Sequence, residues 1–276
     1  MDLRYDIEKV KSSWNFINKL WNASRFVLMN IEDLKSREFD YSDLTISDKW
    51  ILTKKNLIIK SITSSMDKYD FHNVDYDLGI ALDKIYNFIW NEFCDWYIEL
   101  SKANMNDTTK KVLLDVLTTI LKLLHPFMPY VTEEIYSMLP VKEQESIMIS
   151  SYPVFNKEEI FNESKEILEK VLEDIVAIRN LKATNKVTKD SLVEIKTEEN
   201  LLKVYSSQLK IKQENLVNEV PSSLKSINYK SKYIDITYYF EQEEVDNNKI
   251  LEEIEKLTAS IERRKKLLAN ENYVNK

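Results

Sequence analysis

Residues 93–99 read FCDWYIE and residues 123–136 read LLHPFMPYVTEEIY, and the helices around these two runs decide the fold. The first run lies in a stretch whose apolar residues recur in steps of four and three. This spacing predicts one long helix that begins near Val74 and is buried along one stripe. The stripe comprises Leu78, Leu82, Ile85, Ile89, Phe93, Trp96 and Leu100. In the second run, Pro126 and Pro129 predict the end of one helix and the start of the next, because proline is tolerated only in a first turn.

Helical periodicity also extends to either side of these runs. It predicts a helix over residues 5–29, and a second helix that begins with Ser47 or Asp48 as its N-cap and ends near Met66. A helix starting at Asn106 and Asp107 and a short helix over residues 132–139 complete the set. Because the connections are short, we expect an antiparallel helical bundle over residues 1–154.

The pattern changes after Pro153. A helix is predicted over residues 163–183, and the alternating segments 192–195 and 233–238 are typical of strands, so residues 155–243 are expected to form a small α+β subdomain. Residues 244–276 are predicted to contain a C-terminal coiled-coil helix, because Ile250, Ile254, Leu257, Ile261 and Leu268 follow heptad spacing. So narrow a stripe needs a partner helix, and through it the chain could self-associate.

Glycine is almost absent, since Gly79 is the single glycine among 276 residues. An average protein of this length contains about 19. Phosphate-binding loops, tight hairpins and dinucleotide-binding motifs depend on glycine, because it adopts their backbone conformations without strain. Composition therefore favours a mainly α protein and argues against an ATP site within these residues.

The other composition signals bear on the kind of site. Cys94 is the single cysteine, which excludes an internal disulfide and suits a reducing cytoplasm, and its apolar helical setting predicts an inert core thiol. His72 and His125 stand far apart without ligands at metal-binding spacing, so we expect no metal, cofactor or catalytic residue. No apolar run approaches the ~18 residues of a membrane span. The formal net charge of −7 means that any nucleic-acid contact needs a local basic patch.

The second predicted helix offers such a patch. Its presumed core face comprises Ile51, Leu52, Ile58, Ile59, Ile62 and Met66. Trp50 and Leu57 lie together off this face, bordered by Lys49, Lys54 and Lys60, and no acidic residue occurs from position 49 to 66. An aromatic ring flanked by lysines can stack on an unpaired base while the amines meet phosphates. The alternative is that Trp50 packs against a neighbouring helix.

Several runs resemble class I aminoacyl-tRNA synthetases, and valyl-tRNA synthetases above all. They are FCDWYIE at 93–99, LLHPFMPYVTEEIY at 123–136, NFINKLWNASRFV at 15–27, IRNLK at 178–182 and KLLANENYV at 266–274. The resemblance covers most of the chain and is weakest over about 185–230. It implies the anticodon-binding bundle of that family, a small subdomain, and the first helix of a two-helix C-terminal arm.

The resemblance also implies what lies elsewhere. Neither a His-Xaa-Gly-His motif nor a Lys-Met-Ser-Lys-Ser loop is present, so the chain is expected to be the tRNA-recognition fragment of a valine–tRNA ligase. The full-length relatives are cytoplasmic enzymes, expected to be monomeric, that use ATP to attach valine to tRNA(Val). The resemblance implies that their ATP site lies in a catalytic domain, which is not expected within these residues. The partner expected for this fragment is therefore tRNA(Val), without a membrane.

Family likeness assigns candidate contacts with tRNA. The pair Lys49–Trp50 matches a basic–aromatic pair that meets the middle anticodon base, with Lys54 beside it. Leu117, on the fourth helix, matches the apolar partner of that base, and Arg25 matches a basic position that faces tRNA. Without the resemblance, Arg25 would be interpreted as a solvated surface arginine.

The densest basic cluster lies in the C-terminal helix and comprises Arg263, Arg264, Lys265 and Lys266. The resemblance implies that this arm binds phosphates at the corner of tRNA. Four consecutive residues spread around a helix, so a solvated coil surface is the competing interpretation. For the whole chain two alternatives stay open: the anticodon-binding domain of an isoleucyl- or leucyl-type synthetase, and a helical coiled-coil scaffold that recruits another protein.

Overall fold

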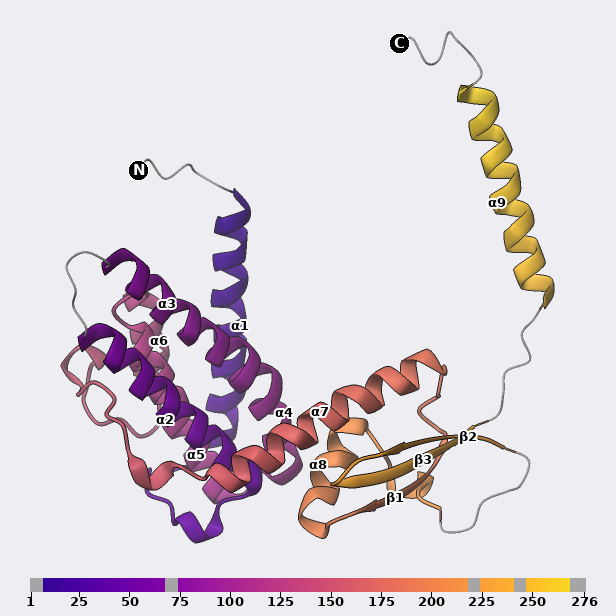
Figure 1. Ribbon diagram of the computed structural model, residues 1–276. Coiled ribbons are helices and arrows are strands. Elements are labelled where there is room, and N and C mark those ends of the chain that lie inside the picture. Colours follow the sequence, from indigo (N-terminus) through magenta and orange to yellow (C-terminus); the bar gives the residue numbers. More distant parts are fainter. Residues whose placement is uncertain (1–6, 68–73, 218–223, 241–246, 269–276) are drawn as a thin grey trace.

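The structure is a computed structural model that describes residues 7–67, 74–217, 224–240 and 247–268 (Figure 1). Its helices are α1 (Ile7–Ile31), α2 (Ile46–Asp67), α3 (Val74–Asn87), α4 (Ile98–Ser101), α5 (Asp107–Leu124), α6 (Pro129–Ser137), α7 (Asn162–Thr184), α8 (Glu199–Leu209) and α9 (Asn247–Leu268). Its strands are β1 (Leu192–Thr197), β2 (Lys225–Lys230) and β3 (Ile234–Phe240). The predicted class, a helical bundle with a small α+β part, is confirmed.

The long helix around FCDWYIE is continuous but not uniformly α-helical. Between α3 and α4, residues Phe88–Tyr97 form a π-helix, and the Ile98 amide donates to the Phe93 carbonyl five residues earlier. These wider turns change the buried stripe, so that Phe93 is followed in the core by Tyr97 rather than by the predicted Trp96. Leu82, also predicted to be buried, is 38% exposed.

Helix starts follow local hydrogen bonding. Thr45 caps α2: its Oγ1 accepts from the Asp48 amide, and the Asp48 carboxylate accepts from the Thr45 amide in return. The prediction of Ser47 or Asp48 as N-cap was therefore wrong by two or three residues. Asn106 caps α5 as predicted, accepting from the Thr109 amide at 2.7 Å.

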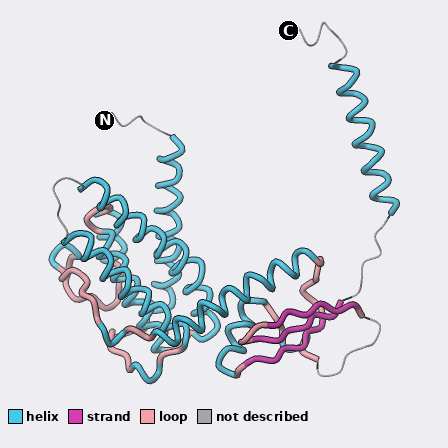
Figure 2. Tube along the Cα trace, viewed as in Figure 1, coloured by secondary structure: helices cyan, strands magenta, loops and turns pink. Residues whose placement is uncertain are grey.

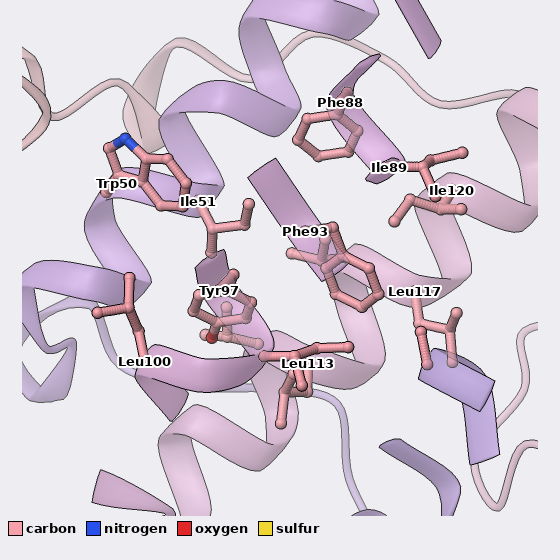
Figure 3. Close-up of a cluster of buried hydrophobic side chains, with 14 of the residues drawn as sticks. Trp50, Ile51, Phe88, Ile89, Phe93, Tyr97, Leu100, Leu113, Leu117 and Ile120 are labelled. Atoms are coloured by element: carbon pink, nitrogen blue, oxygen red, sulfur yellow. The ribbon is translucent and has the colours of Figure 1, made fainter. Parts of the chain in front are cut away.

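The bundle core lies between α1, α2, the π-helical segment and α5, and Figure 3 shows part of it. A buried polar cluster lies at the start of α2: the Asp48 carboxylate accepts from Tyr97 Oη at 2.6 Å and from Thr109 Oγ1 at 3.0 Å. Burial first, and then the Asp48 charge, raise the pKa of Tyr97 well above its ordinary value. Three elements are therefore joined through the first turn of α2.

Helix α7 joins the bundle to the sheet. It packs on α2 and on α8 and runs beside the sheet, as Figures 1 and 2 show. The strands are antiparallel in the order β1-β3-β2, with β3 central. The predicted strands at 192–195 and 233–238 are confirmed as β1 and β3, whereas α8 and β2 were not predicted.

One carboxylate ties this layer together. Asp174 of α7 accepts from Tyr205 Oη of α8 at 2.8 Å, from Tyr229 Oη of β2 at 2.9 Å and from Ser231 Oγ at 2.7 Å. Asp174 is buried, and three hydroxyl donors take the place of water around its charge. Both unpredicted elements, α8 and β2, are thus fixed to α7 through the same side chain.

Candidate nucleic-acid interface

The sequence interpretation required the Trp50 side chain to lie outside the core, exposed to solvent. In the structure Trp50 lies inside the core. Its side chain is 2% exposed, and its Nε1 has no hydrogen-bond partner among the described residues. Leu57, assigned to the same side of α2, is 41% exposed as predicted. The assignment of Trp50 as a platform for an anticodon base is therefore wrong in this structure.

The physical reason is a second partner for α2. Thr53, one turn beyond Trp50, accepts from the Phe161 amide at 2.9 Å and donates to the Glu159 carbonyl at 3.3 Å. Lys54, the next residue, reaches Glu169 of α7. Around Trp50, Thr53 and Lys54, α2 thus faces α7 and the residues before it, which bury Trp50, whereas Leu57 further along the same side stays exposed.

Lys49 and Lys54, the two lysines beside Trp50, differ in whether an acidic side chain already holds the amine. Lys54 Nζ lies 2.7 Å from Glu92 and 3.1 Å from Glu169. Burial lowers the pKa of Lys54, but both carboxylates outweigh it, and the net pKa is raised. The Lys54 amine would have to leave both carboxylates before it could bind a phosphate, and its contact with tRNA stays a prediction. Lys49 is half-buried, with its Nζ 5.9 Å from the centre of the Phe161 ring.

Leu117 is also misplaced by the sequence interpretation. It lies in α5 with no exposed surface, inside the core that Figure 3 shows. A fully buried leucine cannot touch a base without unpacking the bundle. The position assigned to RNA therefore belongs to the core.

Arg25 is the predicted contact residue of the bundle that the structure leaves exposed. It lies on α1, and no ion pair holds it among the described residues. Two tryptophans of the same helix accompany it: Trp14 is 64% exposed and Trp21 is 40% exposed. Spacings of seven and four residues place Trp14, Trp21 and Arg25 on one face, with the indoles about 10 Å apart along the axis.

The charge of α1 also distinguishes it from the rest of this acidic chain. Residues 9–31 contain Lys9, Lys11, Lys19 and Arg25 and no Asp or Glu. Lys19 is engaged on another side, where its Nζ lies 2.6 Å from Asp95 and 3.7 Å from the centre of the Trp90 ring. We define the α1 face as Trp14, Trp21 and Arg25. The absence of acidic residues, which drew attention to α2, would have identified α1 equally well.

The C-terminal cluster is exposed in the part that the structure describes. Every residue of α9 from 255 to 265 is exposed, including Arg263, Arg264 and Lys265, while the Lys266 side chain lies outside the described residues. Of the heptad stripe, Leu257 is 59% and Ile261 is 53% exposed, whereas the side chains of Ile250, Ile254 and Leu268 are outside the described set. The stripe has no cover at these two positions.

The groups that could suggest catalysis have structural surroundings. Burial, as the largest cause, raises the pKa of the Cys94 thiol to about 12, which keeps it protonated and unreactive. His125 Nδ1 lies 2.8 Å from Thr132 Oγ1 at the turn between α5 and α6. His72 lies outside the described residues. Within the described ranges, no group of three or more His, Cys, Asp or Glu side chains could hold a metal ion, and no helix could span a membrane.

Comparison with known proteins gives consistent matches. A family model described as the anticodon-binding domain of tRNA ligase matches residues 48–197. The valine–tRNA ligase of Listeria innocua is 45% identical over 212 residues, which cover 73% of this chain and 23% of that protein. The valine–tRNA ligase of Staphylococcus epidermidis is 51% identical over 187 residues, covering 64% and 20%.

A third relative extends the match along the chain. The valine–tRNA ligase of Staphylococcus saprophyticus is 38% identical over 312 aligned residues, which cover 100% of this chain and 33% of that protein. The chain therefore spans about a third, or less, of the length of these relatives.

Proposed function

This chain belongs to the family of anticodon-binding domains of tRNA ligases, and from this premise we propose that it is the tRNA-recognition part of a valine–tRNA ligase. Such an enzyme attaches valine to tRNA(Val) with ATP, and in this proposal ATP is bound by another part of the longer protein. The relatives described above are valine–tRNA ligases and lend no support to the isoleucyl, leucyl or scaffold alternatives. The cytoplasm, where translation takes place, is the proposed location.

The α1 face is the observation that carries RNA binding by the bundle. Indole rings left in water present apolar surface on which unpaired bases can stack, at ~1–3 kcal/mol per base. The guanidinium of Arg25 lies one turn from Trp21 and can meet a phosphate with several donors. Proteins usually read RNA sequence in single-stranded loops, where bases can leave their stack.

The cluster Arg263, Arg264 and Lys265 supports a second contact, since its side chains are exposed on α9. Each phosphate that these residues neutralise releases counterions. This steepens the slope of the logarithm of the binding constant against the logarithm of the salt concentration by about 0.9 or less. In our proposal each predicted domain has its own role. Residues 1–154 bind the anticodon end of tRNA, residues 155–243 connect the bundle to the C-terminal helix, and residues 244–276 bind the corner of tRNA.

Titration of the chain with tRNA(Val) at two salt concentrations tests the function. We expect binding that weakens steeply as salt rises, because phosphate contacts dominate the affinity. Trp21→Ala is expected to weaken binding about tenfold, from the loss of one stacked base. Tyr130→Ala is the matched control, because Tyr130 is a 91% exposed aromatic residue on α6. Equal losses in both variants, or none with Trp21→Ala, would remove the α1 face from the proposal.

A further inference from the structure

A second basic site lies where α7, α8 and the end of the π-helical segment meet. The structure has a cleft of about 600 Å³ there. Arg179 and Lys182 line it from α7, Lys102 from the end of α4, and Lys210 from the C-terminal cap of α8. Asp95 and Glu99 are its acidic residues.

The acidic residues of this cleft are already neutralised. Asp95 is paired with Lys19 at 2.6 Å, and Glu99 with Lys102 at 2.5 Å. Arg179, Lys182 and Lys210 have no carboxylate partner among the described residues. The cleft therefore keeps three positive charges that nothing in the described structure compensates, in a chain of net charge −7.

Arg179 is held in place before any ligand arrives. Its Nη2 donates to the Gln208 carbonyl at 2.8 Å and to Gln208 Oε1 at 3.1 Å, and its guanidinium lies 5.6 Å from the centre of the Trp96 ring. Both hydrogen bonds use one nitrogen, which leaves the donors on Nε and Nη1 for an anion. The hydrogen bond to Gln208 also satisfies a carbonyl at the end of α8, where a free carbonyl would repel an anion.

Lys182 lies one turn from Arg179 on the same side of α7. Its Nζ is 4.6 Å from the centre of the buried Tyr238 ring. Burial without a compensating acid lowers the pKa of Lys182. A bound anion would supply the negative charge that the protein does not place beside Lys182, and it would stabilise the charged amine.

We propose that Arg179, Lys182 and Lys210 form a binding site for a phosphate group of an RNA backbone. The inference deepens the proposed function and rests on it, because it places a phosphate contact at the junction between bundle and sheet. A planar, fixed guanidinium beside two amines suits the two non-bridging oxygens of a backbone phosphate and the negative charge that they share. The contact is independent of base sequence and serves to position the RNA on the protein.

Lys182→Gln tests the site in the full chain, with Lys142→Gln as the matched control. Lys142 lies in the loop after α6 and donates to the Ser137 carbonyl, so the control removes the same charge elsewhere. We expect Lys182→Gln to weaken tRNA binding about tenfold and to lower the salt slope by about 0.7–0.9. Lys182→Arg should retain most of the affinity. Thermal unfolding of Lys182→Gln should stay close to that of the wild type, because the lost contact with the Tyr238 ring is offset by removal of a charge whose burial no acid compensates.

The outcomes separate this site from the proposed function. In one outcome, the tRNA affinity of the wild type falls steeply as salt rises, and Lys182→Gln has the same affinity and the same salt slope. The junction site is then wrong, while the proposed function is retained. If wild type shows no salt-dependent tRNA binding, both fail. Inorganic phosphate is the second probe, since a free anion has the same chemistry. Micromolar binding of inorganic phosphate that Lys182→Gln abolishes, without loss of tRNA affinity, would overturn the RNA assignment.

Discussion

At the scale of single residues, Trp50 and Leu57 show what a helical wheel can establish. The sequence placed both side chains beyond the core face of α2, and it was correct for Leu57. Trp50 became buried because α7 and the residues before it, more than 100 positions later in the chain, cover that side. Periodicity within α2 carries no information about a helix so distant in sequence. The stripe toward the bundle was predictable, and the contact with α7 was not.

The buried indole makes Trp50 a stability residue. We expect Trp50→Ala to lower the free energy of unfolding by about 3–5 kcal/mol, because truncation of a large core side chain leaves a cavity. Trp50→Phe should lower it less, since most of the apolar surface remains and the unpaired Nε1 donor is removed. Urea denaturation measures both. Leu57→Ala, at a 41% exposed position, is the control; a loss as small as that of the control would mean that Trp50 is not packed as described.

At the scale of elements, the long regular patterns predicted best. Helices α1, α5 and α7 and strands β1 and β3 lie where periodicity placed them. Helix α8 was missed although its buried residues Leu201, Val204, Tyr205, Gln208 and Leu209 have helical spacing. Strand β2 carries a weaker signal, because it lies at a sheet edge and exposes much of its surface. The candidate site fared worse than the fold, since Arg25 alone in the bundle was both predicted and exposed.

The contact of Asp174 with α8 and β2 predicts a loss of stability at alkaline pH. Burial and the hydrogen bond to Asp174 raise the pKa of Tyr229 to about 12 from 10.0. The native state therefore holds this proton more tightly than the unfolded chain does. The stabilisation is complete below pH 10 and is lost as the pH rises through about 12.

Tyr229→Phe tests this linkage. The variant should be less stable than wild type at neutral pH, because Asp174 loses one of its donors. Its stability should also fall less steeply between pH 10 and 12, as followed by urea midpoints at each pH. Tyr130→Phe is the control, because Tyr130 is a 91% exposed tyrosine on α6, away from Asp174. Parallel pH profiles for Tyr229→Phe and wild type would contradict the role of this proton.

At the scale of the whole molecule, α9 stands apart from the rest in Figure 1, and its residues 255–265 are all exposed. A chain that ends at residue 246 should therefore unfold at the same temperature as the full chain. It should also bind tRNA with a smaller salt slope, because Arg263, Arg264 and Lys265 are lost. Calorimetry and salt-dependent titration check the two outcomes. A clear drop in the unfolding temperature would show that α9 packs on the body of the protein.

Exposed Leu257 and Ile261 predict a second effect of the same truncation. An uncovered heptad stripe is stabilised by pairing with another helix, so the full chain should sediment with increasing mass as its concentration rises. The truncated chain should sediment as a monomer throughout. Concentration-independent sedimentation of the full chain would mean that the stripe is too short to associate alone.

The π-helical turns at Phe88–Tyr97 affect where the protein can tolerate the insertion or deletion of single residues. A π-helix has more residues per turn than an α-helix. This segment therefore holds about one residue more than an α-helix of the same length would, and it can lose that residue without shortening the helix. Deleting a single codon there would tighten the winding and rotate the following side chains, while the bundle stays closed. Among natural variants of differing length, we expect this stretch to absorb gains and losses that would disrupt α5.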